Sequence, residues 1–119
     1  MKAHRSLQRT DVLKYAPEKI ALMVASEFWR AVDLAEYPDK VGGCLDRARE
    51  LMGILETVEL PEDVARDLRP LYLACRTEMA ERVAAETPDQ IREIGQDFAE
   101  RFEHIGKRLT EGDSEVAHA

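Results

Sequence analysis

Apolar residues recur at helical spacing in four stretches of this 119-residue chain, and a proline stands near the start of most of them. The clearest stretch covers 91–109, where the apolar side chains fall on one face at about 100° per residue. That face holds Ile91, Ile94, Phe98, Phe102, Ile105 and Leu109. No stretch alternates apolar and polar residues for long enough to indicate a strand. The pattern therefore predicts an all-α chain.

The prolines and acidic residues indicate where the helices begin. Proline suits the first turn of a helix, since its missing N–H would have no partner there. Thr87-Pro88-Asp89-Gln90 is a capping box, with threonine as N-cap and glutamine three residues later. Pro70 lies inside a continuous apolar stripe and predicts a kink rather than an end. The expected helices cover 17–36, 40–57, 61–86 and 88–109.

Four helices of this length, joined by short turns, predict an antiparallel four-helix bundle. A short arm or helix over 1–14 precedes it. The chain is long enough for one core, so we expect a single domain over 1–110. Gly112 and the polar residues after it predict a disordered tail over 111–119.

Charge and cysteine content restrict the class of partner. A net charge of −7 argues against nucleic acid, because binding phosphates needs a clustered cationic surface. Cys44 and Cys75 lie on apolar stripes and are expected to be buried, reduced thiols. No apolar run approaches the ~18 residues of a membrane span, and no apolar segment follows the basic N-terminus. We expect a cytoplasmic protein that does not insert into membranes.

The residues that catalysis needs are not arranged for it. His4, His104 and His118 have no ligand partners at metal-binding spacing, and neither a phosphate loop nor a serine triad is present. The sequence predicts no cofactor, no metal and no enzyme. One alternative is a histidine phosphotransfer bundle, because Lys107 follows His104 by three residues with Gly106 between them.

The helix over 17–36 has a wider apolar arc than one core-facing stripe requires. Leu22 and Trp29 lie on one side of its stripe, and Met23 and Leu34 lie on the other. Either this helix is central, with neighbours on both flanks, or part of its arc binds a partner helix or a second copy. Ile54 and Leu73 also point away from the apolar stripes of their own helices. The predicted partner-binding strip holds Leu22, Trp29, Ile54 and Leu73.

Four segments resemble the flagellar secretion chaperone FliS family, the export chaperones for flagellin. The resemblance lies in their order and spacing along roughly 12–109. Departures include Asp67 where the family has asparagine, Pro70 inside the third helix, and the missing tryptophan near the end of the fourth. The segments are Tyr15–Met23, Cys44–Met52, Val64–Tyr72 and Asp89–Ile94.

The resemblance implies a cytoplasmic bundle that binds the C-terminal helical region of flagellin or a related flagellar protein. The client would fold into helices on apolar strips of the chaperone, which prevents premature polymerisation. It also implies that the N-terminal arm covers the client groove, here through Leu7, Val12 and Leu13. The chaperone would be a monomer or a homodimer.

Overall fold

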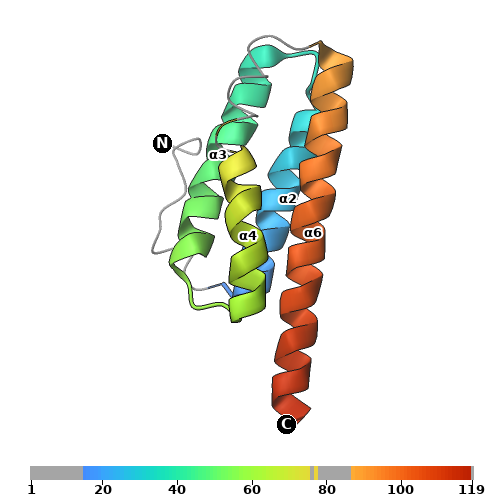
Figure 1. Cartoon of the computed structure of the whole chain (residues 1–119). Coiled ribbons are helices and arrows are strands. Elements are labelled where there is room, and N and C mark those ends of the chain that lie inside the picture. Colours follow the sequence, from blue (N-terminus) through green and yellow to red (C-terminus); the bar gives the residue numbers. More distant parts are fainter. Residues whose placement is uncertain (1–14, 76, 78–86, 119) are drawn as a thin grey trace.

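The computed structural model of this chain describes residues 15–75, 77 and 87–118, and the side chains among these up to residue 111. Four long helices run up, down, up and down (Figure 1). No strand occurs among the described residues. The expected all-α four-helix architecture is confirmed. The helices are α2 (Pro17–Asp33), α3 (Pro38–Thr57), α4 (Glu62–Ala74) and α6 (Pro88–His118).

The helix starts follow the local sequence. Proline occupies the first turn of α2 and of α3. At the start of α6, the Thr87 backbone N–H donates to Gln90 Oε1 at 2.9 Å. In return, the Gln90 backbone N–H donates to Thr87 Oγ1 at 3.4 Å. The capping box expected from the sequence is therefore formed.

One helix end differs from the expectation, and another lies outside the described residues. α4 continues through Pro70 to Ala74, and Cys75 and Thr77 beyond it are π-helical. The expected end of this helix near 86 falls within 78–86, which the structure does not describe. α6 continues to His118, beyond the expected end near 109 and through the segment expected to be disordered. One glycine in an exposed helix costs about 1 kcal/mol, so Gly112 alone does not end it.

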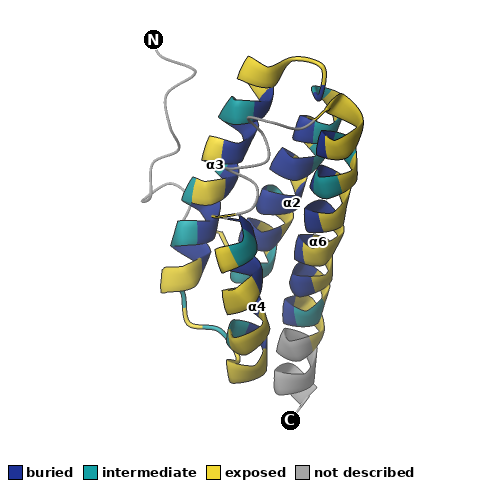
Figure 2. Cartoon of the chain, turned by 45° about the horizontal axis from the view of Figure 1, so that its top comes forward, coloured by how far each residue is buried: buried dark blue, intermediate teal, exposed yellow. Residues whose placement is uncertain are grey.

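The core lies where α2 packs along both α3 and α6. Buried positions form continuous inward faces on these helices and on α4 (Figure 2). Neighbours on both flanks explain why the apolar arc of α2 is wider than one stripe. The largest fully buried side chains include Phe28, Phe102, Ile20, Leu51 and Met52.

α2 and α6 approach each other closely because α6 carries two glycines toward α2. A Cβ atom on Gly95 would lie 2.8 Å from Val32 Cγ2, and one on Gly106 would lie 3.1 Å from Leu22 Cδ2. The two glycines are eleven residues apart, close to three turns of about 3.6 residues each, so they share one face. Between them, the Phe28 ring stacks on two rings of α6. Its centroid lies 5.5 Å from that of Phe98 and 6.0 Å from that of Phe102.

An ionic cluster around the buried carboxylate of Glu27 joins α2 to α3. Glu27 is 8% exposed, and its carboxylate accepts hydrogen bonds from Arg30 Nη1 and Arg47 Nε, each ion pair measuring 3.2 Å. Arg47 Nη2 also lies 3.7 Å from Cys44 Sγ. Burial raises the pKa of the Cys44 thiol. Cys44 and Cys75 are both buried thiols, as the sequence predicted.

The glycines of α3 and α6 allow a matched test of the close packing between α2 and α6. We expect Gly95→Ala to lower the free energy of unfolding, because overpacking a tight contact costs about 1–3 kcal/mol against a propensity gain of about 1 kcal/mol. Gly42→Ala should raise it by about 0.5–1 kcal/mol, because a Cβ there meets nothing within 4 Å. Urea unfolding followed by circular dichroism measures both. Equal stabilisation by the two substitutions would contradict close packing at Gly95.

Candidate functional site

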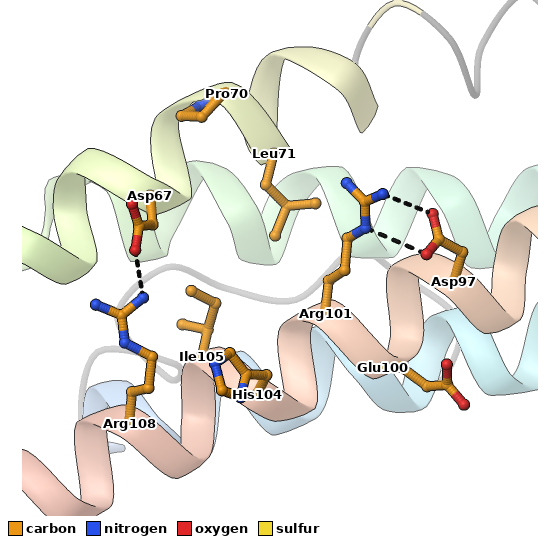
Figure 3. A pocket seen from close by; sticks show the side chains of 9 residues that line it. All are labelled: Asp67, Pro70, Leu71, Asp97, Glu100, Arg101, His104, Ile105 and Arg108. Carbon is orange, nitrogen blue, oxygen red and sulfur yellow. Dashed lines mark hydrogen bonds and ion pairs between the residues drawn. The ribbon is translucent and has the colours of Figure 1, made fainter.

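A hollow of about 520 Å³ lies between α4 and α6, which approach each other less closely than α2 and α6 do (Figure 3). We name it the α4–α6 groove. Both helices contribute to its walls. The residues that line it are Asp67, Pro70, Leu71, Asp97, Glu100, Arg101, His104, Ile105 and Arg108.

The floor of the α4–α6 groove is apolar. Leu71 and Ile105 line it from opposite helices, and both are buried members of the core cluster. Pro70 adds an apolar wall on α4 and has no backbone N–H to donate. An apolar side chain that entered the groove from solvent would therefore contact the core directly. Burying such a side chain is worth about 1.5–3 kcal/mol, which makes the floor a source of affinity.

Arg108 bridges the two helices at one end of the groove. Its Nη1 donates to Asp67 Oδ2 at 2.6 Å and its Nη2 to Asp63 Oδ2 at 3.0 Å. The hydrogen bond from Arg108 lowers the pKa of the Asp63 carboxyl group. The pKa of Arg108 is raised in turn, mainly by its hydrogen bond to Asp67 and further by its hydrogen bond to Asp63. Both carboxylates lie one turn apart on α4, so one guanidinium can reach them together.

A second ion pair lies toward the other end of the groove. Arg101 and Asp97, one turn apart on α6, form two parallel contacts of 3.2 Å. Nε faces Oδ1, and Nη2 faces Oδ2. The guanidinium also lies 5.9 Å from the centroid of the Phe98 ring. Figure 3 shows this pair and the Arg108–Asp67 pair on either side of Leu71 and Ile105.

His104 is exposed and lines the groove, with Arg101 and Arg108 one turn away on either side. Both guanidiniums already donate to carboxylates, and three carboxylates line the same hollow. Lys107 is not among the lining residues. A phosphoryl group on His104 would face these carboxylates without a free guanidinium beside it. The electrostatics therefore disfavour the phosphotransfer alternative.

Within 15–75, 77 and 87–118, no group of three or more His, Cys, Asp or Glu side chains is placed to hold a metal ion. None of the helices in that part of the chain combines the length and apolarity needed to cross a membrane.

Two residues of the predicted partner-binding strip lie on the side of α2 that faces α6. Leu22 is 44% exposed and lies against Gly106. Trp29 is half-buried, and its Nε1 donates to Glu103 Oε2 at 2.9 Å. Gly106 and Glu103 lie on the flank of α6 opposite the α4–α6 groove, so these two residues do not border the groove.

The other residues predicted to bind a partner do not form one surface with Leu22 and Trp29. The expectation that Ile54 is exposed is wrong, because it is 6% exposed and belongs to the core. Ile54 packs in the same buried cluster as residues of α2 and α4, and a Cβ atom on the neighbouring Gly53 would lie 3.4 Å from the Tyr72 hydroxyl of α4. Leu73 is 55% exposed on the outer face of α4. Leu7, Val12 and Leu13 lie outside the described residues.

The apolar pattern of the sequence does not predict the α4–α6 groove. Leu71 and Ile105 belong to the core, but they are also reached from outside. A usable signal was the charge spacing. Asp63 and Asp67, four residues apart, share one helix face and so place two carboxylates where one guanidinium of another helix can reach both.

The Arg108 bridge predicts a specific dependence of stability on acid. The pKa of Asp63 is lowered in the folded protein, so its contribution is present above the unfolded pKa of about 3.9 and is lost as pH falls through the folded value. We expect Asp63→Asn to lose less stability than the wild-type protein between about pH 6 and pH 2.5. Urea midpoints at several pH values measure this. Parallel pH curves would contradict the bridge at Asp63.

No protein-family model, curated protein or solved structure matches the chain. The resemblance to flagellin export chaperones therefore depends on the order and spacing of its four segments. Two departures from that family's pattern, Asp67 and Pro70, line the α4–α6 groove.

Proposed function

We propose that this protein is a helix-binding chaperone of the flagellar export system, whose client segment lies in the α4–α6 groove. The observation that carries the proposal is the apolar floor of Leu71 and Ile105, which belongs to the core and yet lines an open hollow. A four-helix bundle with one interface left wide can receive a further helix there. Apolar side chains of the client would extend the core outward.

The identity of the client comes from the resemblance to the flagellin chaperones. The client is the C-terminal region of flagellin or of a related flagellar protein, which is unfolded before assembly. Binding orders this region as a helix and covers the apolar face through which it would polymerise. The action is stoichiometric and requires no bond to be made or broken. It takes place in the cytoplasm, before export.

The direct test is calorimetry with the purified C-terminal segment of the flagellin from the same organism. We expect saturable binding at micromolar or lower concentration, with a negative heat-capacity change from apolar burial. A gain of helical circular dichroism on mixing should accompany it, because the segment becomes ordered. No detectable heat at concentrations well above micromolar would refute this client.

A pair of single-tryptophan proteins locates the client. The wild-type chain has one tryptophan, Trp29, which faces α6 on the flank away from the groove. Trp29→Phe combined with His104→Trp moves the fluorophore into the groove wall. With a tryptophan-free client segment, we expect a blue shift of emission for the groove variant and little change for the wild type, because only the former becomes buried. The reverse pattern would place the client on the exposed Leu22 side of α2 and contradict the groove.

A further inference from the structure

Among the described residues, the ionic groups of the α4–α6 groove leave one carboxylate, Glu100, without a cationic partner. Arg108 donates to Asp63 and Asp67, and Arg101 donates to Asp97. Both guanidiniums that line the groove therefore already hold carboxylates. Among the described residues, the side-chain partner of Glu100 is the neutral amide of Gln96, at 3.3 Å.

Glu100 lies at the rim of the groove on the α6 side (Figure 3). Three carboxylates line the hollow against two guanidiniums, so the lining carries a net negative charge. Figure 3 shows the two ion pairs on either side of the apolar floor and Glu100 farther out on α6, next to Arg101. Such an arrangement favours a cation beside an apolar surface and opposes an anion.

The length of the groove limits its occupant. From Asp97 to Arg108 the lining of α6 spans twelve residues, and the eleven steps between them, at about 1.5 Å each, make about 16 Å of helix. An occupying helix would thus contact it over about three turns. Over that length, apolar residues at i, i+3 or i+4, and i+7 form one ridge, which the floor of Leu71 and Ile105 can accept.

We propose that the α4–α6 groove selects a cationic amphipathic helix, with an apolar ridge on the floor and a lysine or arginine beside the ridge that pairs with Glu100. This inference rests on the proposed function in one respect, that the groove is the client site. It adds the chemical class of client. Apolar burial supplies affinity, whereas the rim discriminates between clients with the same ridge and opposite flanking charge.

Two synthetic peptides of about 18 residues test the inference, since shorter isolated helices are marginal in water. They share one leucine ridge and differ only in carrying lysines or glutamates at the flanking positions. Fluorescence anisotropy with the full-length protein at physiological salt gives both affinities. We expect the lysine peptide to bind roughly fivefold more tightly or better. Equal binding, tighter binding of the glutamate peptide, or no binding of either would overturn the inference.

Two matched charge variants separate the effect of Glu100 on peptide binding from the effect of the overall negative charge of the protein. Glu100→Gln and Glu56→Gln each remove one exposed carboxylate, but Glu56 lies on α3, outside the groove lining. We expect Glu100→Gln to remove most of the preference for the lysine peptide and Glu56→Gln to keep it. Equal effects would show general electrostatic attraction and contradict a role for Glu100. Lysine-peptide selectivity without binding of the flagellin segment would refute the proposed client and leave the inference standing.

Discussion

The close contact between α2 and α6 determines how the remaining helices are placed. Gly95 and Gly106 remove the side chains that would hold these two helices apart, and Val32 and Leu22 occupy the space. Phe28 then stacks on two rings of α6 between the two glycines. Stacked aromatic pairs contribute about 0.5–1.5 kcal/mol each beyond their buried area, which adds to the apolar packing of this interface. It makes α2 the central helix.

α3 and α4 attach to this pair by different means. α3 packs along α2, and the buried Glu27 is held by Arg30 and Arg47. The Arg30 and Arg47 side chains are 53% and 39% exposed, so these ion pairs orient α3 against α2 but add little to the apolar contacts between the two helices. α4 reaches α6 through the Arg108 bridge at one end, and exposed ion pairs of this kind contribute about 0–1 kcal/mol. Beyond this bridge the α4–α6 interface is wide enough to hold the groove.

Periodicity and capping were sufficient to predict the helices of this fold. The stripe of α6 and the Thr87–Gln90 capping box formed as expected because both depend on residues within one turn of each other. The exposure of residues such as Ile54 and Trp29 was harder to predict, because it depends on how a helix is rotated against its neighbours. Periodicity gives the apolar arc of each helix but not the number of neighbours that cover it. The width of the α4–α6 groove has the same origin, since it is a distance between helices far apart in sequence.

Charge pairing within the groove links the stability of the bundle to its recognition properties. Arg108 stabilises α4 against α6 only while it donates to Asp63 and Asp67, and those contacts leave it unable to attract an anionic client. Arg101 is held in the same way by its ion pair with Asp97. The residues that hold the groove together therefore remove its cations and leave Glu100 to set the sign of the rim. Because apolar contacts are indifferent to the flanking charge of a client, any discrimination among amphipathic helices that share a ridge must come from this rim.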